Sequence, residues 1–185
     1  MKILPTQKGY NIVYADPPWR YGAQGSSSWM GRGAKKHYPT MNLEDIKNLK
    51  IPCGKDCVLF LWVVFPLLKE GLQVMDAWGF KYKTVAFVWI KLNKKNKEPF
   101  CGMGSWTRSN AEICLLGTRG KNKRTSAKVR QVIISERREH SRKPDEVRDR
   151  IIQLMGDNPR IELFARQKNE GWDVWGNEVD KFGTN

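Results

Sequence analysis

Asp16 and the two prolines that follow it are the residues of this sequence best suited to catalysis. They end the apolar run Ile12 to Ala15, which has the composition of a buried parallel strand. In an open α/β sheet, ligands bind at the carboxyl ends of such strands. Two consecutive prolines fix two backbone φ angles and remove two N–H donors, so this segment predicts a rigid turn rich in hydrogen-bond acceptors.

The acceptors in this turn suit a substrate that carries an amino group. The Asp16 carboxylate and the Pro17 carbonyl can each accept one of the two N–H bonds of such a group. Trp19 follows with a flat apolar ring on which a purine or pyrimidine base can stack. The alternative interpretation is an ordinary strand followed by a proline turn, which any α/β protein can contain.

The turn resembles a motif of the S-adenosylmethionine-dependent amino methyltransferases, which methylate the exocyclic nitrogen of adenine or cytosine. Their motif is (D/N/S)-PP-(Y/F/W), and Asp16-Pro17-Pro18-Trp19 has its DPPW form. This form is similar to the branch that contains the mRNA adenosine methyltransferases and their bacterial and phage DNA-modifying relatives. The resemblance implies that Asp16, Pro17, Pro18 and Trp19 are catalytic, and that Trp19 also contacts the target base.

The same resemblance extends, in order, through separate segments from about Ile12 to Glu178. Besides the DPPW turn, these segments are HYPTM (37–41), WIK (89–91), GSW (104–106), NAEICLLG (110–117), HSRKPDE (140–146), RIELFAR (160–166) and WDVWGNE (172–178). A single short motif has a real false-positive rate, but ordered agreement over so many segments by chance is remote.

The resemblance implies an S-adenosylmethionine site and a base pocket. The cofactor contacts that it implies are Asp16, Lys91, Glu162, Arg166, Asn169, Asn177 and Glu178. Tyr38 and Trp106 are implied at the substrate, together with Trp19. The chain lacks a G-x-G-x-x-G loop, so side chains must hold the methionine end of the cofactor. Relatives often carry His at Lys168 and Gln at Glu178, and Asp16 can serve both the methionine amine and the target amine.

The chain is strongly basic, with 33 Lys and Arg against 19 Asp and Glu, a net charge of +14 and a pI of about 9.8. This balance favours a polyanion as partner. We expect the basic segments 91–97 and 119–130 to contact phosphates, with Lys94, Lys95 and Lys97 at the substrate. The alternative is that these residues only keep the loops solvated. DNA is favoured over RNA, because the chain is small and carries no recognisable RNA-binding module.

Length and periodicity predict a single α/β domain over residues 1–185. The predicted strands are 12–15, 57–64, 85–90, 110–117 with its apolar core at 113–116, 132–134 and 160–166. Predicted helices begin at Asn42, Pro66 and Pro144. The segment 20–37 predicts a long loop over the catalytic turn, and 119–130 a flexible arm. With the resemblance, this implies a Rossmann-like class I methyltransferase sheet of permuted motif order, in which the catalytic strand precedes the cofactor strand.

The four cysteines, at positions 53, 57, 101 and 114, predict reduced structural thiols and no metal site. They form no C-x-x-C pair, and neither His37 nor His140 lies at finger spacing from Cys53 and Cys57. The amino terminus is too short for a signal peptide, and no apolar run reaches membrane-spanning length. We therefore expect a soluble protein without a membrane partner, in the cytoplasm of a bacterial or phage-infected cell.

The predicted function is S-adenosylmethionine-dependent methylation of the exocyclic amino group of adenine in nucleic acid. Direct in-line displacement needs no metal and no covalent enzyme intermediate. Four alternatives stay open: an RNA adenosine methyltransferase, a cytosine amino methyltransferase, a catalytically silent partner subunit that binds nucleic acid, and a plain nucleic-acid-binding protein. A homodimer is compatible with the sequence and is also left open.

Overall fold

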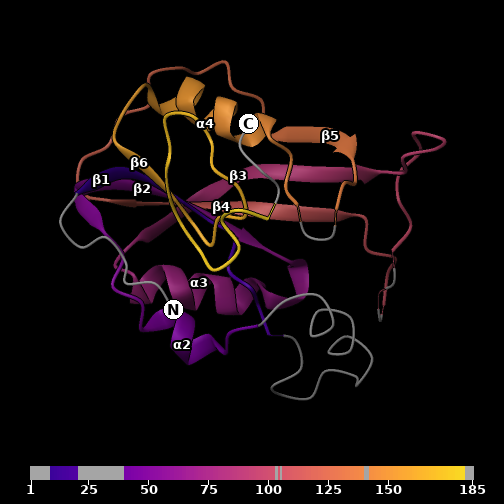
Figure 1. The fold of residues 1–185 in the computed structure, drawn as a ribbon, viewed down its shortest axis with the longest axis horizontal. Coiled ribbons are helices and arrows are strands. Elements are labelled where there is room, and N and C mark those ends of the chain that lie inside the picture. Colours follow the sequence, from indigo (N-terminus) through magenta and orange to yellow (C-terminus); the bar gives the residue numbers. More distant parts are fainter. Residues whose placement is uncertain (1–8, 21–39, 103, 105, 140–141, 182–185) are drawn as a thin grey trace.

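The computed structural model describes residues 9–20, 40–102, 104, 106–139 and 142–181, which fold around one seven-stranded sheet (Figure 1). Its strands are β1 (Tyr10–Ala15), β2 (Cys53–Val63), β3 (Lys81–Leu92), β4 (Ala111–Arg119), β5 (Val132–Glu136), β6 (Arg160–Leu163) and β7 (Asp173–Trp175). The helices described are α2 (Leu43–Lys47), α3 (Leu68–Ala77) and α4 (Glu146–Met155), with a 3₁₀ turn, η1 (Phe65–Leu67), leading into α3.

The sheet is mixed, with the strand order β5-β3-β4-β2-β1-β6-β7. β4 pairs antiparallel with β2 and with β3, whereas the other neighbouring strands pair in parallel. The predicted strand at 110–117 is therefore central, but it runs against its neighbours. The connection 93–110 contains no helix in its described part, whereas the crossover between parallel strands usually contains one, and the chain returns antiparallel after β3. The mixed α/β class is confirmed.

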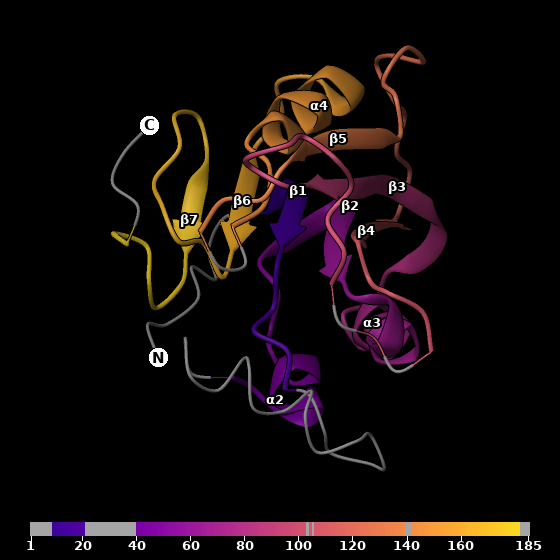
Figure 2. The same ribbon diagram turned by 90° about the vertical axis from the view of Figure 1, so that its right-hand side faces the viewer.

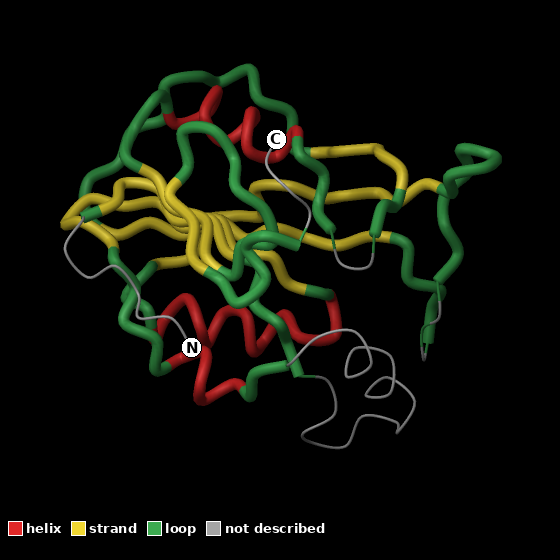
Figure 3. Tube along the Cα trace, in the orientation of Figure 1, coloured by secondary structure: helices red, strands yellow, loops and turns green. Residues whose placement is uncertain are grey.

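Helices cover both faces of the sheet. Figures 1 and 2 show α4 on one face and α2 and α3 on the other, and Figure 3 shows the strands as one layer between them. The alternation along β1 serves both layers, since Val13 and Ala15 belong to the core on the α2–α3 side while Ile12 and Tyr14 belong to the core on the α4 side. None of the helices described has the length and apolar character needed to cross a membrane.

The sequence signals for helix ends are confirmed. The Asn42 side chain accepts a hydrogen bond from the Asp45 amide at 2.8 Å and so caps α2. Gly79 and Gly156 follow α3 and α4 with φ angles of 78° and 80°, which only glycine adopts without strain. Strand β7 was not predicted, because three residues are too few to show strand periodicity.

β1 lies where the order of the strands reverses. β2 pairs with it on one side and β6 on the other. The connection from β1 to β2 carries α2 on one face, whereas the connection into β6 carries α4 on the opposite face. Such a reversal opens a crevice at the carboxyl ends of the strands, where α/β proteins bind ligands. Asp16 follows β1 at this edge.

The basic segment 119–130 lies at the opposite edge of the sheet. Thr118 pairs with Lys81, the first residue of β3, so β4 ends at the amino ends of its neighbours. The Lys121 amide donates to Asp56 Oδ1 at 2.6 Å, and the Thr125 amide donates to the Leu154 carbonyl at 2.8 Å. These bonds tie the segment to β2 and α4, which differs from the predicted flexible arm.

Candidate active site

Hydrogen bonds to both prolines and to Trp19 hold the Asp16-Pro17-Pro18-Trp19 turn. The Trp19 amide donates to the Pro17 carbonyl at 2.8 Å, and the Met41 amide donates to the Pro18 carbonyl at 2.9 Å. The Trp19 indole N–H donates to the Trp62 carbonyl at 3.1 Å. A carbonyl oxygen carries two lone pairs, so Pro17 retains acceptor capacity after this internal bond. These hydrogen bonds and the two prolines together restrain the turn.

The Trp19 ring lies inside the protein. It is 6% exposed and belongs to the apolar core on the α2–α3 side. In this structure Trp19 offers almost no open face for a stacked base, and its contacts fit a role in holding the turn. The sequence could not distinguish the two positions, because a large aromatic ring is common both in cores and at stacking sites.

Trp19→Ala is expected to lower the free energy of unfolding by about 3–5 kcal/mol, the usual cost of emptying a buried aromatic site. The matched control is Trp106→Ala, because Trp106 is 99% exposed and its loss should leave stability unchanged. Urea unfolding of both variants measures the difference. A Trp19→Ala variant as stable as the wild type, with weaker substrate binding alone, would support the stacking role instead.

A chain of alternating charges begins at Asp16. Lys143 Nζ lies 2.6 Å from Asp16 Oδ2 and 3.2 Å from Glu112 Oε2, and Lys91 Nζ lies 2.5 Å from Glu112 Oε1. The Lys143 side chain is 7% exposed, so its charge depends on these two acids. The four residues come from the ends of β1, β3 and β4 and from the start of α4, which meet at one edge of the sheet.

Burial and ion pairing set the protonation of this charge chain. Burial opposes ionisation of Glu112, but Lys143 and Lys91 outweigh it and lower the pKa of Glu112 to about 2. Burial also opposes the charge on Lys143, and Asp16 and Glu112 overcome it to raise the pKa of Lys143. Burial raises the pKa of Asp16 above 3.8, against the opposing effect of Lys143. Asp16 is thereby a stronger base than an exposed aspartate.

The Glu112 carboxylate should make the protein lose stability in acid. Its folded pKa of about 2 lies below the ordinary 4.5, so its contribution is complete above pH 4.5 and is lost as the pH falls toward 2. A shift of this size corresponds to about 3 kcal/mol. Glu112→Gln should therefore unfold more easily than wild type at pH 6 and differ much less at pH 3. Urea titrations at both pH values measure this, with exposed Glu44→Gln as control; an equal difference at both pH values would contradict it.

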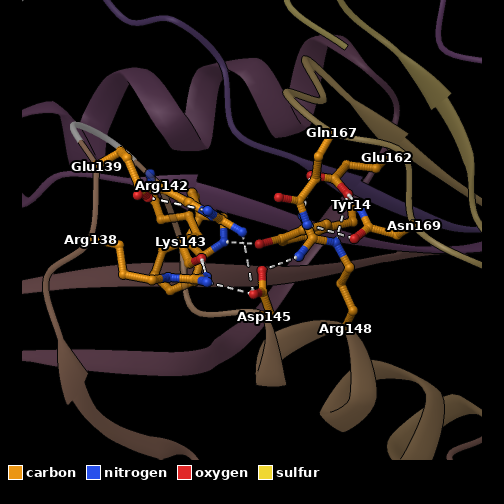
Figure 4. A network of polar contacts seen from close by, with 11 residues as sticks. Tyr14, Arg138, Glu139, Arg142, Lys143, Asp145, Arg148, Glu162, Gln167 and Asn169 are labelled. Atoms are coloured by element: carbon orange, nitrogen blue, oxygen red, sulfur yellow. Dashed lines mark hydrogen bonds and ion pairs between the residues drawn. The ribbon is translucent and has the colours of Figure 1, made fainter. Parts of the chain in front are cut away.

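A second network lies beside the first one. Arg148 donates from Nε and from Nη2 to the two oxygens of Glu162, each at 2.8 Å, and Asn169 Nδ2 lies 3.3 Å from Glu162 Oε2. Gln167 Nε2 in turn donates to Asn169 Oδ1 at 2.7 Å. Figure 4 shows Asp145 at the start of α4, linked to Arg148 on one side and to Arg138 on the other. Glu162 and Asn169, both predicted at the cofactor, are therefore brought together.

Tyr14 lies between the two networks. Its hydroxyl accepts a hydrogen bond from the Trp62 indole at 2.7 Å, and its ring lies 5.8 Å from the Arg148 guanidinium. Lys143 lies 5.5 Å from the centre of the Trp62 ring on the other side. The aromatic pair thus separates the Asp16–Lys143 contact from the Arg148–Glu162 contact.

Two other predicted cofactor residues form a pair of their own. Arg166 Nε lies 3.0 Å from Glu178 Oε2, just beyond β6. Asn177 is exposed beside them. The backbone between β6 and this pair turns at Phe164, which has a φ of 61°, a conformation rare for a bulky residue. Such backbone strain is concentrated at functional sites.

The predicted substrate residues lie farther out. Trp106, Lys94 and Lys95 are exposed on the connection between β3 and β4, at the same edge as Asp16. Lys97 is also exposed and forms an ion pair with Glu136 at the end of β5. Tyr38 and almost all of the predicted loop 20–37 lie outside the described residues.

Comparison with known proteins identifies the family. The MT-A70 family model matches residues 10–178. The chain belongs to the MT-A70 family. It is 36% identical, over 95% of its length and 80% of the other protein, to the type II methyltransferase M.MunI of a Mycoplasma species. It is 31% identical to an N(6)-adenosine-methyltransferase MT-A70-like protein of Arabidopsis thaliana and 30% identical to the N(6)-adenosine-methyltransferase catalytic subunit METTL3 of Homo sapiens.

The chain spans most of M.MunI but only about a quarter of these eukaryotic relatives, 25% of the Arabidopsis protein and 28% of the human one. The matched residues include both charge networks and every predicted site residue. The predicted amino methyltransferase family is therefore confirmed.

Several residues of this MT-A70 site were not assigned a role from the sequence: Glu112, Lys143, Asp145, Arg148 and Tyr14. Lys143 and Glu112 lie within motif segments, but neither stands next to Asp16 in the chain. Arg148 lies in the first turn of α4, where a charged residue normally faces solvent. The sequence alone does not show that the Arg148 side chain forms an ion pair with an acid on β6.

Proposed function

We propose that this MT-A70 protein transfers a methyl group from S-adenosylmethionine to the exocyclic N6 amino group of adenine in DNA. The observation that carries the proposal is the partly buried Asp16 carboxylate, which precedes the Pro17 carbonyl at the carboxyl end of β1 and is paired with the buried Lys143. Adenine is supported by the N(6)-adenosine-methyltransferases among the relatives. DNA is supported because the chain covers most of the length of M.MunI, whereas it covers only about a quarter of the length of the adenosine methyltransferases.

The residues at this edge fit S-adenosylmethionine chemically. Lys143 offers a buried ammonium to the methionine carboxylate, and Asp16 offers a carboxylate to the methionine amine. Gln167 is 2% exposed, and its Oε1 is buried without a hydrogen-bond partner among the described residues. A buried acceptor without a partner is costly, and a donor of the adenosine moiety can satisfy it. Glu162, Arg166, Asn169, Asn177 and Glu178 complete the proposed contacts, and Lys91 acts through Glu112.

The chain's own residues act on the target amine. An exocyclic aromatic amine is a poor nucleophile because its lone pair is delocalised into the ring. Hydrogen bonds to Asp16 and to the Pro17 carbonyl draw the nitrogen toward tetrahedral geometry and orient its lone pair. The bound cofactor supplies the electrophilic methyl group. Asp16, with its raised pKa, then accepts the proton that the amine must lose.

The proposed fold is a Rossmann-like class I methyltransferase domain with permuted motif order. β1, which carries the catalytic turn, comes first in the chain, whereas β6, which carries Glu162, comes near its end. The two strands are nevertheless neighbours, with Tyr14 paired to Glu162. This register supports a single site shared by the early catalytic segment and the late cofactor segment.

Methyl transfer from labelled S-adenosylmethionine to double-stranded DNA, single-stranded DNA and RNA tests the proposal. We expect label in DNA, recovered as N6-methyladenine after hydrolysis. Label in RNA alone would show that the substrate polymer is RNA and not DNA. Label on cytosine would show that the target base is cytosine and not adenine. Nucleic-acid binding without any transfer would assign the chain to the silent partner class.

Neutralising Lys94, Lys95 and Lys97 to Gln should weaken DNA binding on all sequences alike. Each lost phosphate contact lowers the slope of log affinity against log salt by about 0.7–0.9. The matched control neutralises Lys121, Lys123 and Arg124. These substitutions remove the same amount of charge at the opposite edge of the sheet. A salt titration by fluorescence anisotropy compares the two. Equal effects would show that binding depends on net charge, and an unchanged slope in the first variant would show that these lysines only solvate the loop.

A further inference from the structure

Cys53 and Cys57 meet at an irregularity of β2, at the end of the sheet away from Asp16. Tyr10 pairs with Cys53 and Ile12 pairs with Val58, so two steps along β1 correspond to five steps along β2. Residues 54–57 therefore bulge from the β1 ladder, while Cys57 stays paired with Arg119 on β4. Two steps of a strand span about 6.6 Å, so the β1 register holds the α-carbons of Cys53 and Val58 about that far apart, with Cys57 next to Val58 in the chain. A disulfide requires α-carbons about 4.4–6.8 Å apart.

The two thiols are in contact and share a cation. The Cys57 thiol is close enough to Cys53 to stabilise its thiolate, and Arg119 Nη1 lies 3.0 Å from Cys53 Sγ. Arg119 reaches this position because it pairs with Cys57 across the β2–β4 ladder. Cys57 is buried, whereas Cys53 is partly exposed, so solvent molecules reach Cys53 first.

We propose that Cys53 and Cys57 form a hydroperoxide-reactive thiol pair, in which Cys53 is oxidised first and Cys57 resolves it to an intramolecular disulfide. Reactive cysteines occupy electropositive, partly exposed positions, whereas buried structural cysteines are inert. Cys53 meets that description beside Arg119, and Cys57 supplies the adjacent second thiol. The pair is independent of the proposed methyl transfer, because the catalytic turn lies at the other end of β1.

The charges around the two cysteines determine which thiol is oxidised first. The hydrogen bond from Cys57 favours the Cys53 thiolate, and together with Arg119 it lowers the pKa of Cys53 to about 6 against the opposing effect of burial. The hydrogen bond to Cys53, burial and the negative charge of Cys53 raise the pKa of Cys57. Cys57 therefore stays protonated while Cys53 is a thiolate. Oxidation of Cys53 removes that charge and frees Cys57 to react.

Both steps balance with a hydroperoxide as oxidant. The Cys53 thiolate attacks the terminal peroxide oxygen; an S–O bond forms, the O–O bond breaks, and the departing alkoxide takes a proton to leave as an alcohol. Sulfur loses two electrons and becomes a sulfenic acid. Cys57 sulfur then attacks Cys53 sulfur; an S–S bond forms, the S–O bond breaks, and water leaves with the Cys57 proton.

The first test measures the alkylation of Cys53 by iodoacetamide at pH 6, resolved by peptide mass spectrometry. A pKa of about 6 rather than about 8.5 raises the thiolate fraction roughly 160-fold there, while the lower intrinsic nucleophilicity costs about 13-fold. We expect Cys53 in the folded protein to react about tenfold faster than in an unstructured peptide of the same sequence. Arg119→Gln should slow it, and a rate no faster than the peptide's overturns the proposal.

The second test treats the folded protein with hydrogen peroxide and maps its cysteines. We expect a Cys53–Cys57 link, with the intact mass reduced by two hydrogen atoms and restored by a thiol reductant. Cys57→Ser should leave a sulfenic acid at Cys53 that dimedone traps, and Cys53→Ser should abolish both products. Cys101→Ser is the control, since Cys101 is exposed and should not affect the link. A link that involves Cys101, or dimedone labelling spread equally over the cysteines, overturns the assignment.

Discussion

Asp16→Asn is expected to lower kcat for methyl transfer by about 10²–10⁴-fold, the usual contribution of a positioned acid or base. The variant keeps the shape of the side chain and one acceptor oxygen, but it cannot take up the proton that the amine loses. Asp16→Ala removes both functions and should abolish transfer. Burial raises the pKa of Asp16 above 3.8, so wild-type kcat/KM should rise with pH through that raised value, and this acid limb should disappear in Asp16→Asn.

The folded state should survive this change, because Lys143 keeps a second partner. Glu112 Oε2 lies 3.2 Å from Lys143 Nζ and continues to compensate its charge when Asp16 becomes neutral. Circular dichroism and urea unfolding establish that the variant is folded, and calorimetry with S-adenosylhomocysteine separates the two roles of Asp16. A loss of turnover with full cofactor affinity assigns Asp16 to the target amine. Activity within tenfold of wild type in a folded variant removes it from the mechanism.

The catalytic turn and its strand could be predicted because their signals are local. The apolar run of β1 and the two prolines lie within a few residues of one another, as do β6 and the polar residues beyond it, and parallel strands place such ends at one edge. Helix limits were predictable for the same reason, since Asn42 and Gly156 act on their own helices. The pairing of β1 with β6 brings the catalytic turn next to Glu162, and the order of the segments in the sequence does not predict this pairing.

The partners of the charged residues could not be predicted, because they depend on distances between segments far apart in the chain. Lys143 reaches Asp16 across 127 positions, and nothing in the spacing selects it over other lysines. The basic segment 119–130 was expected to join 91–97 at the nucleic acid, but the reversal of β4 carries it to the opposite edge. Composition reports the charge of a segment, and only topology reports the edge at which that charge lies.

Glu162→Gln is expected to lower the free energy of unfolding by about 3–5 kcal/mol, the cost of breaking a buried ion pair by removing one partner. Arg148 and Glu162 are 9% and 7% exposed, and their two hydrogen bonds of 2.8 Å are lost or weakened together. Asp180→Asn is the control, because its pair with Lys168 is largely exposed and should be worth about 0–1 kcal/mol. Urea unfolding measures both, and a Glu162→Gln cost below 1 kcal/mol would contradict the expected burial of the pair.

The same pair allows the structural role of Glu162 to be separated from its proposed contact with the cofactor. In the double variant Arg148→Met with Glu162→Gln, no buried charge is left uncompensated at this pair, so most of the lost stability should return. Affinity for S-adenosylhomocysteine should not return with it, since a hydrogen bond to a charged acceptor is worth about 1.5–3 kcal/mol, or roughly 10–150-fold in affinity. A stable double variant that binds S-adenosylhomocysteine as tightly as wild type would show that Glu162 only anchors α4 to β6. A stable variant with weakened binding would place its carboxylate at the cofactor.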